Sequence, residues 1–312
     1  MAMSKRSKKK NREELPEGMS RRQAKLARRA AEREALAKDP RPFKGLACEA
    51  DLVALQMFVP SAVAQLGDAS DQRNVELVTV LPGAVAAVVR EATEHAPETA
   101  QVALQVQSRS DHPGRDLAFA LHWAQTAPAG ESLASTAADG SQPELNQLIP
   151  ADAELTITEY SDFSWWVPEG ATPDVMTAQA IRRAEETLVP SHQITADVPG
   201  SVWWVNPGGG KAHIRWVRTD DNEERVLQAL ARIAARGELK LGQETKFAGV
   251  FRTHGLVVPV WDLDPERPFD SYTQDLEQLN KELDAELGND AQLDADERKQ
   301  LQNIKSRQVT IG

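Results

Sequence analysis

Several short stretches of the chain alternate between hydrophobic and polar side chains, which is the pattern of a strand with one buried face. In residues 211–216, Ala212, Ile214 and Trp216 alternate with basic side chains. In residues 101–107, aliphatic side chains alternate mainly with glutamines. We therefore predict strands in both stretches, each with a second face that is partly exposed to water. Apolar, β-branched and aromatic composition predicts further strands at residues 75–81, 86–91, 154–160, 163–167, 201–206 and 255–263.

Other stretches repeat apolar side chains with the 3.6-residue period of a helix. Between Asn222 and Gly237, the side chains of Val226, Leu230 and Ile233 recur at this spacing. Acidic residues begin this segment and a glycine ends it, as is typical of helix termini. Further helices are predicted at residues 49–59, 115–127, 173–188, 274–287 and 294–305, the first of them ended by Pro60.

The order strand, strand, helix recurs three times, which predicts an α+β fold with antiparallel sheets and helices on one sheet face. This fold would occupy the body of the chain, residues 41–312, as one domain or as two halves, 41–126 and 150–270. A loop rich in Ala, Ser and Gly, residues 127–149, would join the halves. Strongly charged helices within residues 272–306 would close the chain at its periphery.

Charge is distributed very unevenly along the chain. Residues 1–44 contain 15 basic side chains (Lys and Arg) and 6 acidic ones (Asp and Glu), a net charge of +9. Residues 45–312 contain 21 basic and 41 acidic side chains, a net charge of −20. Because residues 1–40 have few large apolar side chains, we predict a tail that is disordered at first and forms a solvated helix after Ser20. We expect this tail to bind the phosphates of RNA, ribosomal RNA or DNA. The side chains expected to make these contacts are Lys5, Arg6, Lys8, Lys9, Lys10, Arg21, Arg22, Arg28 and Arg29.

Composition excludes several other classes of protein. Cys48 is the only cysteine, so no internal disulfide can form, and a reducing cytoplasm is the expected location. No run of eighteen apolar residues is present, which argues against a membrane-spanning helix. The histidines lack the i, i+4 spacing of a helical metal site and no cysteine pair exists, so we expect neither a metal nor a cofactor.

A glycine-rich stretch at residues 206–216, NPGGGKAHIRW, resembles a phosphate-binding loop because three glycines precede a lysine. The P-loop pattern requires a glycine where Val205 stands and a hydroxyl where Ala212 stands. A strand follows the lysine here, whereas a P-loop leads into a helix whose N-terminus faces the phosphate. We therefore predict a hairpin turn at this position.

The densest mixture of aromatic, basic and acidic residues lies at 247–264, where Arg252, His254 and Trp261 are candidates to line a small-ligand pocket. The alternative is a core strand that begins after a glycine turn. Paired tryptophans at 165–166 and 203–204 offer a second possibility, because exposed indole rings can anchor a partner protein.

Three functional hypotheses arise from these patterns. The leading one is a non-enzymatic cytoplasmic protein, without catalytic, cofactor or metal residues, that docks on RNA, the ribosome or DNA through its tail. The second is an enzyme or small-ligand binder that uses the pocket near Arg252, His254 and Trp261. The third is a protein-binding adaptor with exposed tryptophans. For the tail itself, a solubilising role, folding back onto the acidic body, or binding a protein partner are the alternatives.

The stretches RPFKGLACEADLVAL, VTVLP and FAGVFRTHGLVVPVWDL, together with the final SRQVTI, resemble an uncharacterised actinobacterial protein family classed as a domain of unknown function. The resemblance runs from Arg41 to the C-terminus. It implies a cytoplasmic bacterial protein whose body is a single family domain, and it implies no catalytic residues. Some members carry a preprotein-translocase label, which the absence of a P-loop and of a metal-binding cysteine tail does not support.

Overall fold

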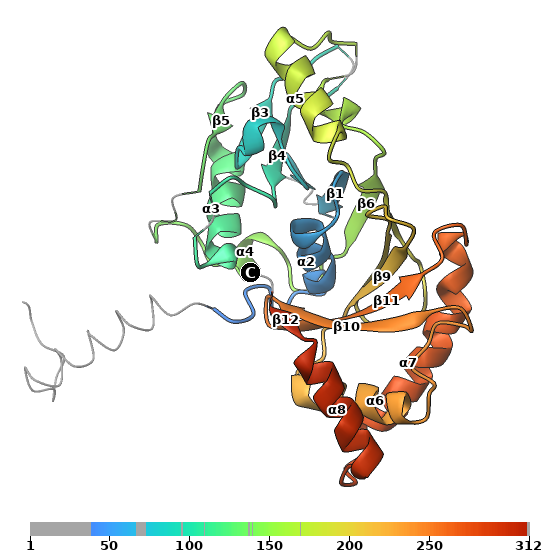
Figure 1. The fold of residues 1–312 in the computed structure, drawn as a ribbon. Coiled ribbons are helices and arrows are strands. Elements are labelled where there is room, and N and C mark those ends of the chain that lie inside the picture. Colours follow the sequence, from blue (N-terminus) through green and yellow to red (C-terminus); the bar gives the residue numbers. More distant parts are fainter. Residues whose placement is uncertain are drawn as a thin grey trace, which may run out of the picture. The chain divides into compact units, whose positions relative to one another are not determined.

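The structure is a computed structural model that describes residues 39–66, 73–94, 96–108, 110–136, 138, 140–168 and 170–310. The chain divides between Asp39 and Pro40, and both sheets belong to the unit Pro40–Gly312. Two mixed sheets, each of six strands and mostly antiparallel, combine with seven α-helices in the described residues (Figure 1). This arrangement confirms the predicted α+β fold.

The first sheet has the strand order β5-β3-β4-β2-β1-β6. Its strands are β1 (Ala62–Leu66), β2 (Asn74–Val78), β3 (Ala87–Arg90), β4 (Thr99–Ala103), β5 (Ser132–Leu133) and β6 (Leu155–Glu159). All neighbours are antiparallel except β2 and β4. Strand β6, expected in a second half of the body, pairs with β1 over Ala62–Leu66. Residues 127–149, predicted as a joining loop, contain β5 and α4 and lead into β6 of the same sheet.

The second sheet has the order β12-β10-β11-β9-β8-β7. Its strands are β7 (Ser191–Gln193), β8 (Ser201–Val205), β9 (Ala212–Val217), β10 (Lys246–Thr253), β11 (Leu256–Leu263) and β12 (Val309–Thr310). Only β10 and β12 are parallel. The glycine-rich stretch connects the antiparallel pair β8 and β9 through three consecutive glycines with positive φ, Gly208 to Gly210, so the predicted hairpin turn is confirmed.

The helices are α2 (Glu49–Met57), α3 (Pro113–Thr126), α4 (Leu145–Leu148), α5 (Val175–Glu185), α6 (Glu223–Ala235), α7 (Thr273–Leu287) and α8 (Ala295–Ser306). Helix α6 forms where its apolar period predicted, with the side chain of Asn222 accepting the N–H of Arg225 at its start. Helix α7 is less peripheral than expected, because it buries Leu276, Leu279 and Leu283 against the same core as α6.

Both faces of the second sheet are covered. Neighbouring tryptophans of β8 show this, since Trp204 packs in the core that includes α6 and α7, and Trp203 packs in the core shared with α2, α3 and the first sheet. Helix α2 lies between the two sheets (Figure 1). The polar face of β9, expected to be partly wet, turns toward this helix, with the guanidinium of Arg215 5.2 Å from the ring centre of Phe58.

One predicted strand is wrong. Residues Ser164–Trp166 form a 3-10 turn, because both indole rings fold back onto the first sheet. The Nε1 atom of Trp165 donates to Ser61 Oγ at 2.9 Å, and that of Trp166 donates to the carbonyl of Val80 at 2.9 Å. These two hydrogen bonds require both side chains to reach the same sheet, whereas neighbouring residues of a strand point to opposite faces.

Candidate functional site

The three residues proposed to share a pocket lie on one hairpin but are not brought together. In the β10–β11 pairing, Arg252 faces Val257 and Trp261 faces Phe247. Five residues along β10 separate the two positions, which corresponds to roughly 16 Å. The indole of Trp261 is fully buried and packs against the rings of Trp216 and Phe247. Trp261 therefore contributes to the core and does not reach the surroundings of Arg252.

His254 lies in the two-residue turn of this hairpin. His254 and Gly255 have φ of 50° and 73°, the left-handed pair of a tight hairpin turn. The imidazole stacks on Phe43 with ring centres 5.6 Å apart. A Cβ at Gly255 would lie 2.4 Å from the carbonyl oxygen of Pro40, so the turn closely contacts the first residues of the body.

Arg252 lines a polar cleft of about 480 Å³ at the N-terminal end of α6, which we call the α6 N-terminal cleft. Its lining residues are Asp221, Asn222, Glu223, Glu224, Leu227, Arg252, Lys305 and Gln308. Arg252 pairs with Glu223, and Lys305 Nζ lies 2.8 Å from Glu224 Oε2. Because carboxylates already neutralise both cations, the cleft offers little to an anionic ligand.

The first residues of the body are fixed beside this cleft by Arg41. Its guanidinium donates to both carboxylate oxygens of Glu49 at 2.7 and 2.8 Å, to Asp221 at 3.0 Å, and to the carbonyl of Thr219 at 2.7 Å. The bidentate pair with Glu49 raises the pKa of Arg41. These contacts hold Arg41 against α2 and against the residues that precede α6.

The nine basic residues expected to bind nucleic acid lie outside the described residues. They are Lys5, Arg6, Lys8, Lys9, Lys10, Arg21, Arg22, Arg28 and Arg29.

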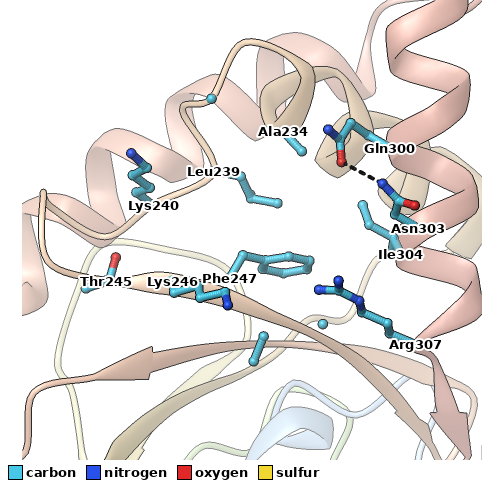
Figure 2. A pocket seen from close by; sticks show the side chains of 13 residues that line it. Ala234, Leu239, Lys240, Thr245, Lys246, Phe247, Gln300, Asn303, Ile304 and Arg307 are labelled. Carbon is cyan, nitrogen blue, oxygen red and sulfur yellow. Dashed lines mark hydrogen bonds between the residues drawn. The ribbon is translucent and has the colours of Figure 1, made fainter.

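A separate cavity of about 270 Å³ lies at the other end of α6, which we call the α6–β10–α8 pocket (Figure 2). Its lining residues are Ala234, Gly237, Leu239, Lys240, Thr245, Lys246, Phe247, Ala248, Gly249, Gln300, Asn303, Ile304 and Arg307. A β-bulge between Phe247 and Gly249 interrupts the β10 ladder where that strand forms one side of the pocket. Three elements, α6, β10 and α8, meet at this pocket.

The polar and apolar groups of this pocket are arranged differently from those of the cleft. Lys240, Lys246 and Arg307 line it, no carboxylate does, and none of the three forms an ion pair with a described residue. Figure 2 shows the guanidinium end of Arg307 extending toward the ring of Phe247. Leu239 and Phe247 supply apolar surface between these cations. The pocket thus presents unpaired positive charge next to an apolar wall.

Sequence reasoning singled out the stretch that contains Phe247 but missed this pocket. Lys240 and Arg307 are far apart in the sequence, and neither belongs to a recognisable motif. Near the pocket, the sequence offered only the glycine predicted to end the helix, Gly237. In the structure this residue ends α6 with a φ of 75°.

The remaining candidates, Cys48 and the tryptophans, are buried or partly buried. The Cys48 side chain is 2% exposed, and burial raises the pKa of its thiol to about 11, so it carries almost no thiolate at neutral pH. All seven tryptophans lie in the described part of the chain; five are buried, and Trp123 and Trp165 are partly buried. In the described residues, no three His, Cys, Asp or Glu side chains are grouped to hold a metal ion.

No described helix combines the length and the apolar character needed to cross a membrane.

Comparison with known protein families identifies a match for the body of the chain. The model of a family described as "Family of unknown function (DUF5926)" matches residues 42–312. No curated protein and no solved structure matches the chain. The matched residues span the whole body from Pro42 onward, including both sheets, the α6 N-terminal cleft and the α6–β10–α8 pocket. The chain therefore belongs to the DUF5926 family, a family of unknown function.

Proposed function

We propose that this protein is a non-enzymatic cytoplasmic binding protein that docks on RNA, the ribosome or DNA through its basic N-terminal segment. The observation that carries this proposal is the separation of charge, +9 over residues 1–44 and −20 over residues 45–312. Lysine and arginine side chains attract nucleic acid by replacing the cations condensed on its phosphates, and an acidic body repels the same polyanion. Binding would therefore be confined to the N-terminal segment.

The pairing of the cations at the α6 N-terminal cleft supports this division. At the α6 N-terminal cleft, Arg252 and Lys305 are neutralised by Glu223 and Glu224. Such pairs present no excess positive charge to a phosphate backbone. The anchoring of Arg41 also supports the proposal, since a polyanion held by the N-terminal segment would be tethered to a fixed residue of the body.

The test uses the full chain and a full-length variant in which the nine basic residues, Lys5, Arg6, Lys8, Lys9, Lys10, Arg21, Arg22, Arg28 and Arg29, are replaced by glutamine. Fluorescence anisotropy with a labelled single-stranded RNA, a DNA duplex of matched length, and sedimentation with ribosomes measure binding at 50 and 200 mM salt. We expect the native chain to lose about three decades of affinity over this range and the variant to lose binding at both.

Two controls sharpen this test. Lys281→Gln with Lys299→Gln, two exposed positions of the body, is expected to leave binding unchanged. A chain whose first 39 residues are scrambled is expected to bind as the native chain does if charge alone is recognised. Equal, salt-insensitive behaviour of the native chain and the nine-residue variant would overturn the proposal.

A further inference from the structure

We propose that the α6–β10–α8 pocket is a binding site for a small organic anion, with one carboxylate or phosphate group joined to an apolar body. This inference concerns a site and a ligand class separate from the docking function proposed above. It rests on the unpaired cations, on the apolar wall between them, and on the way the chain fixes both.

The charge of the pocket is opposite to that of the body around it. Residues 45–312 contain 41 acidic side chains against 21 basic ones, yet the pocket is lined by three cations and no carboxylate. Elsewhere around α6 the cations have partners: Arg236 pairs with Glu238 and Glu286 at 2.7 and 2.6 Å, and Lys305 pairs with Glu224. An anionic ligand would supply the partner that Arg307, Lys240 and Lys246 lack within the described residues.

Arg307 is the best placed of these cations to hold an anionic group. It directly follows α8, and its side chain extends toward the ring of Phe247 (Figure 2). A guanidinium presents a planar fork of N–H donors that matches two oxygens of a carboxylate or a phosphate. The anionic group would therefore lie at the α8 side of the pocket, with the apolar body of the ligand directed toward Phe247.

The apolar wall is fixed before any ligand binds. The Phe247 ring packs edge-on against the buried Trp261, with ring centres 5.5 Å apart. Leu239 and Ile304 are each 4% exposed and cannot move out of the way without opening the core. The loop that carries Leu239 and Lys240 is closed by the N–H of Leu241, which donates to Thr245 Oγ1 at 2.7 Å. A preformed wall reduces the ordering that binding requires.

Pocket size limits the ligand to a small molecule. A cavity of about 270 Å³ lies just below the range of roughly 300–1,000 Å³ that is usual for small-molecule sites. A single aromatic ring or a short branched alkyl group with one anionic substituent is the expected scale. Nucleic acid would not fit, because the cavity admits one such group and no polymer backbone.

The same cations have a structural alternative that the test must separate. Lys240 and Arg307 follow the C-terminal ends of α6 and α8, where a positive charge stabilises the helix by interacting with its last carbonyls. If this is their whole role, Arg307→Gln lowers the melting temperature and leaves ligand affinity unchanged. If Arg307 holds an anion, affinity falls whatever happens to the melting temperature.

Titration calorimetry and ligand-observed NMR with the full chain test the proposal with four probes: 3-phenylpropionate, phenyl phosphate, the neutral 3-phenylpropionamide, and inorganic phosphate. We expect the carboxylate or the phosphate ester to bind at least tenfold more tightly than the amide and than inorganic phosphate. The ratio between the first two probes identifies which anionic group the pocket prefers. Equal binding of the acid and its amide would overturn the proposal.

Variants assign the binding to this pocket. Arg307→Gln is expected to weaken the best anion at least tenfold, Arg307→Lys to weaken it less, and Phe247→Leu to weaken it severalfold. Lys299→Gln, on α8 but outside the pocket lining, is the matched control and is expected to change nothing. The proposal would be contradicted if Arg307→Gln left the affinity for the best anion unchanged, or if no probe bound the native chain. RNA binding, measured in parallel, is expected to be the same in Arg307→Gln and in the native chain.

Discussion

Helix α6 has a hollow at each end, and the same three elements, α6, β10 and α8, line both. At the N-terminal end, Arg252 and Lys305 are held by Glu223 and Glu224. At the C-terminal end, Arg307 and two lysines line the pocket without a carboxylate. Both hollows contain basic residues, so the presence of cations does not by itself distinguish them. The difference is whether the chain supplies the counter-charge itself.

The two hollows also differ in the surface that separates their charges. The α6 N-terminal cleft is mainly polar, with Leu227 as its one aliphatic lining residue among the described residues. The α6–β10–α8 pocket contains Leu239, Phe247 and Ile304, backed by the buried Trp261. An apolar wall next to an unpaired cation favours an amphipathic ligand, whereas a wet cleft of paired charges favours only water and ions.

The largest expected effect comes from the residue that backs the pocket wall. Trp261→Ala removes a fully buried indole that packs on Trp216 and Phe247, and is expected to lower the free energy of unfolding by about 3–5 kcal/mol. Urea denaturation followed by circular dichroism measures this change.

Trp261→Phe is the control for that substitution. It is expected to cost much less, because an aromatic ring is retained and the Trp261 Nε1 atom has no hydrogen-bond partner among the described residues to lose. If Trp261→Ala lowers the free energy of unfolding by less than about 1 kcal/mol, the packing of Trp261 does not support the apolar wall of the pocket.

A smaller effect is expected at the cleft. Arg252→Gln breaks the ion pair with Glu223, but the Arg252 side chain is 45% exposed, so the free energy of unfolding should change by less than about 1 kcal/mol. Anion affinity measured by calorimetry should stay the same, in contrast to the tenfold loss expected for Arg307→Gln. Equal losses of anion affinity in Arg252→Gln and Arg307→Gln would contradict the conclusion that only the α6–β10–α8 pocket binds an anion.

The smallest effect is electrostatic and concerns Asp221, which lines the cleft. A hydrogen bond from Lys44, together with the charges of Lys44 and Arg41, lowers the pKa of the Asp221 carboxyl. Because the pKa is lower in the folded than in the unfolded state, this carboxylate stabilises the protein at neutral pH. That contribution is lost as the pH falls through the folded-state pKa.

Carboxyl-detected NMR titration checks this sign. Lys44→Gln is expected to shift the Asp221 midpoint upward, toward its ordinary value, and Lys44→Arg to leave it low. Binding of the phosphate probe at the α6–β10–α8 pocket should not vary with this titration, because no carboxylate lines that pocket. A midpoint that does not move in Lys44→Gln would assign the low pKa to another group.

Local pattern was sufficient for the elements whose partners are sequence neighbours. The alternation of Ala212, Ile214 and Trp216 predicts β9, and these are the side chains that β9 buries in the α6 core. The period of Val226, Leu230 and Ile233 predicts α6 and its buried face. In both cases the apolar face must be buried, whichever part of the chain packs against it. The periodicity alone therefore identifies the element.

Pattern failed where distant segments decided the conformation. Trp165 and Trp166 were expected to lie in a strand, yet both donate hydrogen bonds to residues at one end of β1 and β2, about 100 residues away in sequence for Trp165. The proposed grouping of Arg252, His254 and Trp261 failed for a related reason, since neighbours in sequence along a hairpin can lie at its turn, its edge and its buried face.

By itself, the sequence determined the α+β class, most of the strands and helices, the hairpin turn at residues 206–211 and the separation of charge along the chain. These properties depend on composition and on short periods, which are local. Only the tertiary structure decided that Arg252 is paired and Arg307 is not, and that both faces of the second sheet are covered. Pairing and burial depend on which residues meet across long loops, and no local period records that information.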